Sequence, residues 1–212
     1  MNQLVLFDCD GVLVDTEPLA YDVLVEALRA AGSDQAPALA EQCVGRSLAD
    51  IRLWLAKQLP VTDSNRFWSQ LALRTEEAIR EGIKPNNCVS TTLEQIPYPT
   101  CVASSGTHQK IRLSLGCASL LSYFEGRIFS AEDVSRGKPA PDLFLYAARV
   151  MQVLPENCCV IEDSLPGLRA AEAAGMASIH FSPHQQSEHQ HHVREFEDIP
   201  KLLEHVLDSL TH

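Results

Sequence analysis

The feature that most constrains the fold is a short apolar run near the start of the chain that ends in two aspartates. Leu4–Phe7 contains four apolar residues without polar alternation, which is typical of a strand buried on both faces of a parallel sheet. Asp8, Asp10 and Gly11 follow. Because open α/β sheets bind ligands beyond the carboxyl ends of their strands, the sequence predicts an active-site loop directly after this strand.

The stretch that follows Thr16 predicts helices only. Apolar residues recur at helical spacing, and Gly or Pro residues are placed to end each helix, over residues 17–31, 47–59 and 63–80. Three successive helices without a strand between them predict an inserted α-helical cap domain. The expected division is therefore a cap at residues 17–82 and a core formed by residues 1–16 and 83–212.

From Thr91 onward the pattern changes to short apolar segments that alternate with helical ones. The expected strands cover residues 100–103, 127–130, 158–161 and 177–181. Repeated β-α units predict an α/β protein with a Rossmann-like parallel sheet and helices on both faces. The His-rich segment 184–192 lacks apolar anchors, so a mobile surface loop is expected there rather than a metal site.

Polar side chains follow several of these strands, at the sheet edge where parallel strands end together. They are Asp8 and Asp10, Ser104, and Glu162 with Asp163. Four carboxylates in one small volume require a cation at neutral pH. Oxygen-only ligands indicate a hard ion, and Mg²⁺ is the expected one because it leaves coordination positions for a phosphate.

A phosphoryl group fits the other residues at this edge. Ser104 and the N–H groups of the Ser-Ser-Gly turn can hold its oxygens, and Lys138 supplies positive charge from a later loop. One aspartate could attack phosphorus while the other protonates the leaving oxygen. Ser104 is equally expected as a plain helix N-cap. Cys9, between the two aspartates, is expected to point into the sheet rather than act as a nucleophile.

Four segments together resemble the motifs of the haloacid dehalogenase-like hydrolases. They are FDCDGVLVDTE at 7–17, VASSGT at 102–107, GKPAPDLF at 137–144 and IEDSLPGLRAAEAAGM at 161–176. The helical insertion resembles the cap of the subgroup that holds β-phosphoglucomutase and phosphoglycolate phosphatase-like enzymes. Order and spacing match over nearly the whole chain.

The resemblance implies a role for each matching residue. Asp8 would be the nucleophile that forms an aspartyl-phosphate, and Asp10 the general acid and base. Mg²⁺ would be bound by Asp8, the backbone carbonyl of Asp10 and Asp163, with Glu162 as a further ligand or an orienting residue. The phosphoryl group would be held by Ser104, Ser105 and Lys138.

Substrate choice is expected to depend on the cap. Thr16 lies at its hinge, and Arg46, in the Gly45-Arg46-Ser47 loop, could pair with a distal phosphate or carboxylate; Arg74 is a weaker candidate. Ala20 stands where the mutase branch has a histidine, which favours hydrolysis. The sequence thus predicts a Mg²⁺-dependent phosphatase for a small phosphorylated metabolite, such as a sugar phosphate or 6-phosphogluconate. A sugar-phosphate mutase and a non-catalytic sensor are the alternatives.

Composition excludes two classes of partner. The formal net charge is −11 and the basic residues are scattered, which argues against nucleic-acid binding. No apolar run approaches membrane-spanning length and the first residues do not resemble a signal segment, so a cytoplasmic protein without a membrane partner is expected. The seven cysteines lie mostly in apolar runs, as reduced core cysteines do. No apolar patch is evident, and a monomer is expected.

Overall fold

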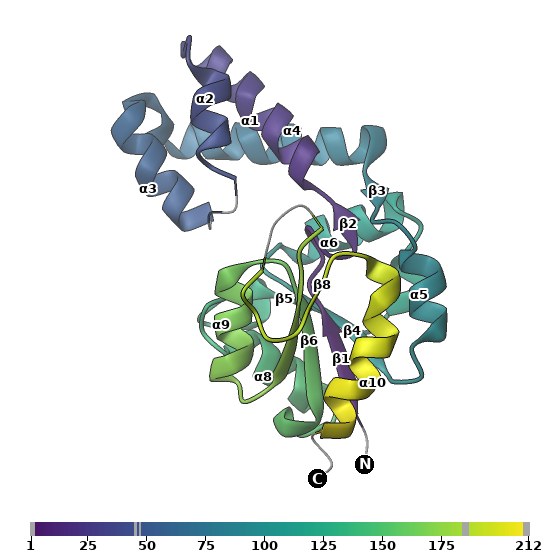
Figure 1. Cartoon of the computed structure of the whole chain (residues 1–212). Coiled ribbons are helices and arrows are strands. Elements are labelled where there is room, and N and C mark those ends of the chain that lie inside the picture. Colours follow the sequence, from purple (N-terminus) through teal and green to yellow (C-terminus); the bar gives the residue numbers. More distant parts are fainter. Residues whose placement is uncertain (1–2, 45, 47, 184–186, 210–212) are drawn as a thin grey trace. The chain divides into compact units, whose positions relative to one another are not determined.

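The computed structural model describes residues 3–44, 46, 48–183 and 187–209 (Figure 1). The chain forms two compact units. The first contains Met1–Val14 and Lys84–His212, and the second contains Asp15–Ile83. The strands β2 (Val14–Asp15) and β3 (Lys84–Pro85) pair with each other at the two points where the chain passes between the units.

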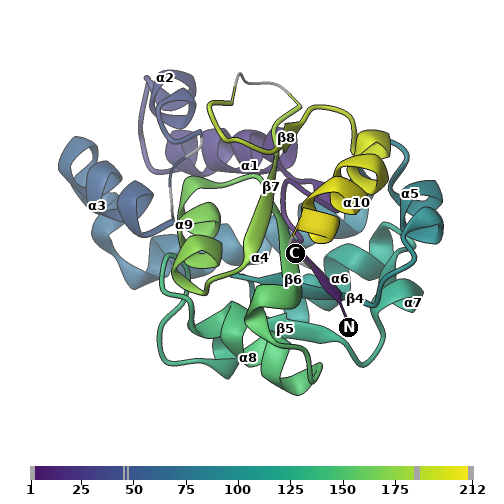
Figure 2. The ribbon, with the colours of Figure 1, turned by 60° about the horizontal axis from the view of Figure 1, so that its bottom comes forward.

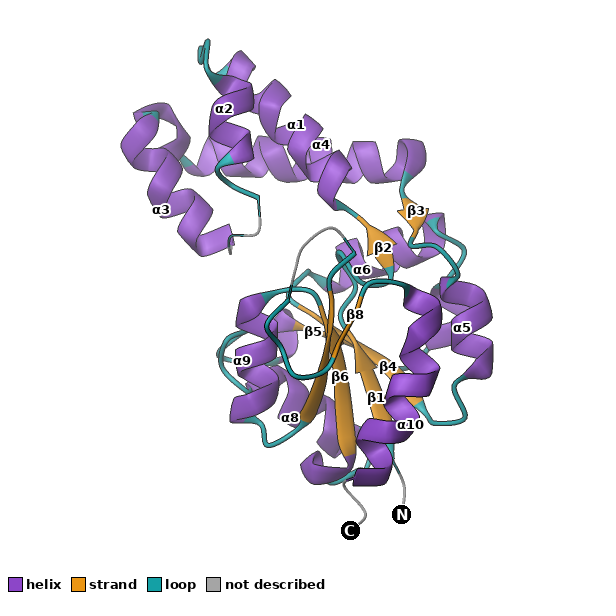
Figure 3. Cartoon of the chain, in the orientation of Figure 1, coloured by secondary structure: helices purple, strands orange, loops and turns teal. Residues whose placement is uncertain are grey.

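The first unit is built on a six-stranded parallel sheet with the strand order β5-β4-β1-β6-β7-β8 (Figure 3). The strands are β1 (Leu4–Phe7), β4 (Thr100–Ser104), β5 (Ile128–Ser130), β6 (Cys158–Glu162), β7 (Ala177–Phe181) and β8 (His192–Val193). The apolar run at the start of the chain is a central strand, as predicted. The predicted α/β fold class is confirmed.

Helices cover both faces of this sheet, and Figure 1 shows α9 and α10 on opposite sides of it. The helices of this unit are α5 (Val89–Gln95), α6 (His108–Cys117), α7 (Leu121–Phe124), α8 (Asp142–Val150), α9 (Leu165–Ala173) and α10 (Ile199–Ser209). Short 3-10 turns occupy Ala131–Asp133, Pro155–Asn157 and Phe196–Asp198. Leu4 and Leu6 pack into the α8–α9 cluster, whereas the ring of Phe7 contacts Phe124 and Phe196. Two apolar layers explain why β1 has no polar alternation.

Over the residues that the structure describes, the His-rich segment is a surface loop that ends in a short strand. His184 lies outside the described residues. His192 and Val193 form β8, which pairs with His180 and Phe181 of β7. The ring of His189 lies 3.2 Å from Ser178 Oγ. Residues 187–191 form a loop with bends and partly or fully exposed side chains, as predicted, whereas His192 belongs to β8; the mobility of this loop stays a prediction.

In the described residues of the second unit, the regular secondary structure is helical apart from one residue of β2 (Figure 2). It contains α1 (Glu17–Ala30), α2 (Ala36–Glu41), α3 (Leu48–Gln58), a 3-10 turn (Pro60–Asp63) and α4 (Asn65–Gly82). Their apolar faces share one core that includes Leu28, Leu55 and Phe67. The sequence predicted three of these four helices. It missed α2, which has only six residues and buries only small alanines.

Candidate active site

The register of the central strands brings the predicted site residues to one sheet edge. Phe7 of β1 pairs with Val102 of β4 on one side and Ile161 of β6 on the other. Asp8 directly follows Phe7, and its N–H donates to the Ile161 carbonyl over 3.0 Å. Ser104 and Glu162 end the two neighbouring strands. The predicted convergence at the carboxyl ends is thus a consequence of the parallel pairing.

The loop after Asp8 is held in shape by a glycine and by a distant asparagine. Gly11 has φ of +79°, and a Cβ there would overlap Asp163 Oδ2. The side-chain amide of Asn86 donates to the carbonyls of Gly11 at 3.0 Å and Val12 at 2.7 Å. The sequence did not reveal Asn86. These contacts allow the loop to approach the end of β6 closely.

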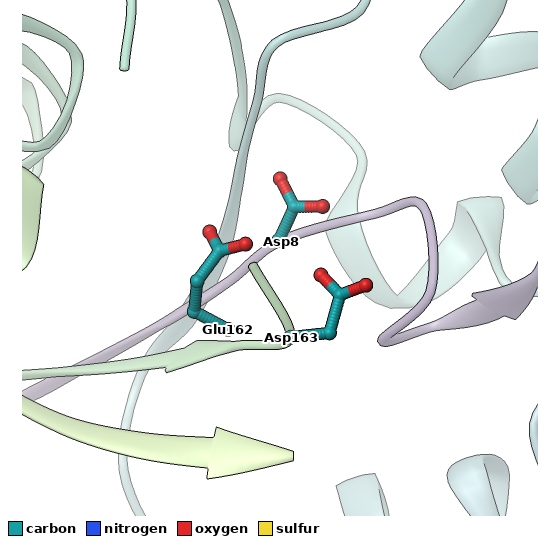
Figure 4. Close-up of side chains that lie close together, drawn as sticks. All are labelled: Asp8, Glu162 and Asp163. Carbon is teal, nitrogen blue, oxygen red and sulfur yellow. The ribbon is translucent and has the colours of Figure 1, made fainter. Parts of the chain in front are cut away.

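Three carboxylates meet at this edge. Oxygens of Asp8, Glu162 and Asp163 all lie within 4.8 Å of one another (Figure 4). Asp8 is 7% exposed and Glu162 is 1% exposed. Four carboxylates were expected together, but the structure groups three, because the carboxylate of Asp10 pairs elsewhere.

Lys138 provides the positive charge inside this group. Its Nζ donates to Asp8 Oδ1 at 2.6 Å and to Glu162 Oε2 at 2.7 Å. The side chain is 4% exposed, and the ammonium lies 4.9 Å from the ring centroid of Phe144. Lys138 therefore reaches the strand ends from a later loop, as predicted.

Glu162 is fixed from a second side by the start of α9. Its Oε1 accepts hydrogen bonds from the Ser164 backbone N–H and, at 2.7 Å, from the Ser164 hydroxyl. That hydroxyl also caps α9 by accepting from the N–H of Gly167. A Cβ at Gly167 would overlap the Glu162 carboxylate. Glu162 is thereby aimed at Lys138.

The protonation of the cluster is strongly affected by its surroundings. Burial raises the pKa of Asp8 to about 7, the negative charges of Glu162 and Asp10 add to this, and Lys138 opposes it. Burial and the charges of Glu162 and Asp8 also raise the pKa of Asp163 well above its usual range. Burial lowers the pKa of Lys138, but Asp8 and Glu162 outweigh it and raise the pKa overall.

The donor set of this cluster fits a divalent cation. Three carboxylates face one ammonium, so an additional cation would stabilise their charged forms against the burial and the mutual repulsion that raise the pKa of Asp8 and Asp163. Every ligand atom is oxygen, which suits Mg²⁺.

Asp10 has a partner that the sequence did not reveal. Its Oδ2 accepts a hydrogen bond from Lys110 Nζ at 2.6 Å. Its other oxygen, Oδ1, is buried without a partner among the described residues. Lys110 lies in the first turn of α6, close after the Ser-Ser-Gly turn. In the sequence, only the position of Lys110 close after this turn could have pointed to a role at the site. A lysine on a helix usually faces solvent.

The predicted phosphate loop lies between β4 and α6. Ser104 is 1% exposed, and its hydroxyl accepts from the N–H of Gly106 at 3.3 Å, whereas Ser105 is exposed. The N-cap of α6 is Thr107, so the N-cap alternative for Ser104 is wrong. Ser130, at the end of β5, donates to the Gly106 carbonyl at 2.6 Å and braces the loop. The sequence did not reveal that brace.

His180 supports the same edge from β7. Its Nε2 donates to the backbone carbonyl of Asp163 at 3.1 Å, and its Nδ1 lies 2.6 Å from the Ser187 hydroxyl. Burial is the main reason that the pKa of His180 is lowered. A neutral ring with a proton on Nε2 satisfies both contacts.

Cys9 lies in the core, as predicted. It is 1% exposed. Burial and the charges of Asp10 and Asp8 raise the pKa of its thiol well above the usual range. A buried thiol that resists ionisation is a poor nucleophile.

The residues predicted to select the substrate belong to the second unit. Thr16 directly precedes α1. The guanidinium of Arg46 lies 5.1 Å from the ring centroid of Trp54, and both line a cavity of about 480 Å³. Gly45 and Ser47 lie outside the described residues. Arg74, on α4, lines a separate cavity of about 250 Å³.

Comparison with known proteins identifies the family. The model of the haloacid dehalogenase-like hydrolases matches residues 3–175, so the chain belongs to this family of hydrolases. A 6-phosphogluconate phosphatase of Escherichia coli is 31% identical over 87% of this chain and 85% of its own length. A phosphorylated carbohydrates phosphatase of Thermotoga maritima is 29% identical over 84% of each chain.

The fold of this chain is similar to that of solved structures of the same family. A family hydrolase from Deinococcus radiodurans, with bound phosphate and sodium, superposes with a TM-score of 0.77. It is 26% identical, and the match covers 99% of this chain and 97% of that one. Within the described part of the present chain, every helix is too short or too polar to cross a membrane.

Proposed function

We propose that this hydrolase is a Mg²⁺-dependent phosphatase acting on a small phosphorylated metabolite, a sugar phosphate or sugar-acid phosphate such as 6-phosphogluconate. One observation carries the proposal: Asp8 directly follows the central strand, and its carboxylate lies beside Lys138 and the acidic pair Glu162 and Asp163. The named activities of the relatives from Escherichia coli and Thermotoga maritima support the substrate class.

In this proposal Asp8 attacks phosphorus. The new bond joins an Asp8 oxygen to phosphorus, the bond to the leaving oxygen breaks, and Asp10 gives that oxygen a proton. Water then attacks the aspartyl-phosphate and returns a proton to Asp10. Free phosphate leaves and Asp8 is restored. Lys138, Ser104 and Ser105 hold the oxygens of the transferring group.

Asp8, Asp163 and the backbone carbonyl of Asp10 are proposed to hold Mg²⁺. Glu162 is already engaged by Lys138 and Ser164, which favours an orienting role for it over direct ligation. The bound ion would offset negative charge between the carboxylates and the phosphoryl oxygens. Lys138 also offsets negative charge here, since its ammonium lies 2.6 Å from Asp8 Oδ1.

A phosphate-release screen tests this function. The panel contains 6-phosphogluconate, hexose phosphates, phosphoglycolate and nucleotides, each with Mg²⁺ and with EDTA. We expect Mg²⁺-dependent release from sugar or sugar-acid phosphates, and its loss in Asp8→Asn. The matched control is Asp198→Asn, which removes a carboxylate from the 3-10 turn before α10. Wild-type turnover by a folded Asp8→Asn protein would refute the nucleophile assignment.

Arg46 and Thr16 are proposed to select the substrate within this class. The ring of Trp54 supports the Arg46 guanidinium, which can form paired hydrogen bonds to a carboxylate. An Arg46→Ala variant is expected to raise KM for 6-phosphogluconate more than for a neutral sugar phosphate. Equal changes for both substrates would argue against recognition of the acid group.

The mutase is the second candidate, and Ala20 counts against it. A mutase has to shield its aspartyl-phosphate from water, and the histidine of that branch is replaced here. Product analysis by NMR separates the two, because a mutase yields isomerised hexose phosphate and little free phosphate. A non-catalytic sensor is disfavoured because it would not need both Asp8 and Asp10. Monomeric state and cytoplasmic location stay predictions.

A further inference from the structure

The lysine next to Asp10 has no role in the mechanism described so far. Lys110 Nζ lies 2.6 Å from Asp10 Oδ2, although the two residues are 100 positions apart in the sequence. The two side chains are about equally exposed, at 30% and 29%. The pair is thus partly buried, and it joins a lysine of α6 to the loop that follows β1.

Lys110 is held in place by its own backbone. It lies in the first turn of α6, and its N–H donates to the hydroxyl of Thr107, the N-cap of this helix. The carbonyl of Gly106, just before this cap, accepts from the buried hydroxyl of Ser130. The base of the Lys110 side chain is therefore fixed by the same contacts that fix the phosphate loop.

The contact distinguishes the two oxygens of Asp10. Oδ2 is occupied by the ammonium, whereas Oδ1 is buried and has no hydrogen-bond partner among the described residues. An unpaired buried carboxylate oxygen is costly unless a ligand supplies its partner. The ammonium therefore restrains the Asp10 carboxylate through one of its two oxygens.

We propose that Lys110 is a positioning residue that holds the Asp10 carboxyl group by Oδ2, in the orientation from which this group delivers the proton to the leaving oxygen. This inference rests on the proposed phosphatase function. A proton passes from the Asp10 carboxyl group to the oxygen released from phosphorus, and the attacking water later returns one to the Asp10 carboxylate. Lys110 keeps its own protons throughout. Its positive charge also stabilises the negative charge that develops on Asp10 during the transfer.

Two aryl phosphates of similar size test the proposal. Phenyl phosphate has a poor leaving group that needs protonation, whereas p-nitrophenyl phosphate has a good one that does not. Replacing Lys110 by methionine keeps the length of the side chain but removes its donor. We expect Lys110→Met to lower kcat/KM for phenyl phosphate by ~10- to 100-fold, and for p-nitrophenyl phosphate by less than ~3-fold.

Further variants separate a positioning role from a structural one. Lys110→Arg keeps a charged donor and is expected to restore most of the phenyl phosphate activity. Lys110→Met should add no further loss in an Asp10→Asn background, because it acts through that carboxylate. Lys201→Met is the matched control, since it removes an exposed lysine of α10. Thermal unfolding of each variant monitors its folding.

The outcomes are distinct. Equal losses for the two esters, or losses that add to those of Asp10→Asn, would overturn the role of Lys110 and leave the phosphatase proposal intact. Such a pattern would indicate that Lys110 contacts the phosphoryl group itself or only stabilises the fold. If the wild-type protein hydrolysed neither these esters nor any member of the metabolite panel with Mg²⁺, the proposed function would fail together with this inference.

Discussion

The ammonium of Lys138 lies 2.6 Å from Asp8 Oδ1, and both side chains are almost entirely buried. Lys138 is also bound to Glu162, so one cation serves two carboxylates. Removing it would leave both without their main opposing charge, and uncompensated buried charge is strongly destabilising.

A Lys138→Met variant should therefore lose both activity and stability. We expect kcat to fall by about 10²- to 10³-fold, because a charge that stabilises the transferring group is lost. The free energy of unfolding without metal should fall by about 3–5 kcal/mol. Phosphate release and urea unfolding measure the two effects, with Lys201→Met as control. A Lys138→Met protein of normal activity would contradict a role in phosphoryl binding.

Stabilisation by Mg²⁺ should depend on pH. Asp8 titrates at about 7 in the folded, metal-free protein, whereas an aspartate in an unfolded chain titrates near ~4. The folded state then binds more protons between these values, so the free energy of unfolding falls as pH rises from about 4 to about 7. Mg²⁺ competes with this proton and binds best above the pKa of Asp8.

Thermal unfolding with and without Mg²⁺ measures this linkage. The same Mg²⁺ concentration, set at about 100 times the Kd measured at about pH 8, is used at both pH values. It should raise Tm by roughly 5–10 °C at about pH 8, and by much less at about pH 5.5. Asp163→Asn should abolish the difference. An equal Mg²⁺ effect at both pH values would indicate that Asp8 is not a ligand.

Gly167→Ala should disturb the site from the first turn of α9. The added Cβ would overlap the Glu162 carboxylate, which Lys138 and Ser164 hold in place. We expect a loss of about 1–3 kcal/mol in the free energy of unfolding, with a fall in kcat. The control is Gly116→Ala in α6, where a Cβ meets nothing within 4 Å and should stabilise by about 0.5–1 kcal/mol. Similar effects of both substitutions would argue against the close approach.

Gly11→Ala should weaken Mg²⁺ binding beyond the cost of its backbone conformation. Gly11 has φ of +79°, and its Cβ would overlap Asp163 Oδ2. Gly32→Ala is a matched control, because Gly32 has φ of +90° but a Cβ there meets nothing within 4 Å. Both should lose about 1 kcal/mol to backbone strain. Only Gly11→Ala is expected to lower Mg²⁺ affinity in a calorimetric titration.

Local patterns explain which parts could be predicted from the sequence. The apolar runs of β1 and β6 end in carboxylates, and parallel pairing brings those ends together. Lys110 and Asn86 could not be found in this way, since their partners lie 100 and 75 residues away. On a helix or in a loop, neither residue differs in pattern from one that faces solvent.

Short secondary-structure elements were also hard to predict from the sequence. β8 has two residues, and its pairing with β7 depends on the backbone rather than on apolar side chains. In α2 a proline and three alanines give little amphipathic contrast. The packing partners of both elements decide their form, and these partners are remote in sequence.

The N–H of Asn86 donates to the carbonyl of Leu13, so the chain leaves and re-enters the first unit at hydrogen-bonded neighbours. The entropic cost of closing a loop between such fixed ends grows slowly, by about 0.6 kcal/mol for each doubling of its length. The intervening helical segment can therefore be lengthened, shortened or exchanged with little penalty. Changes confined to this helical segment can therefore alter the substrate range, while Asp8, Lys138 and Asp163 stay unchanged.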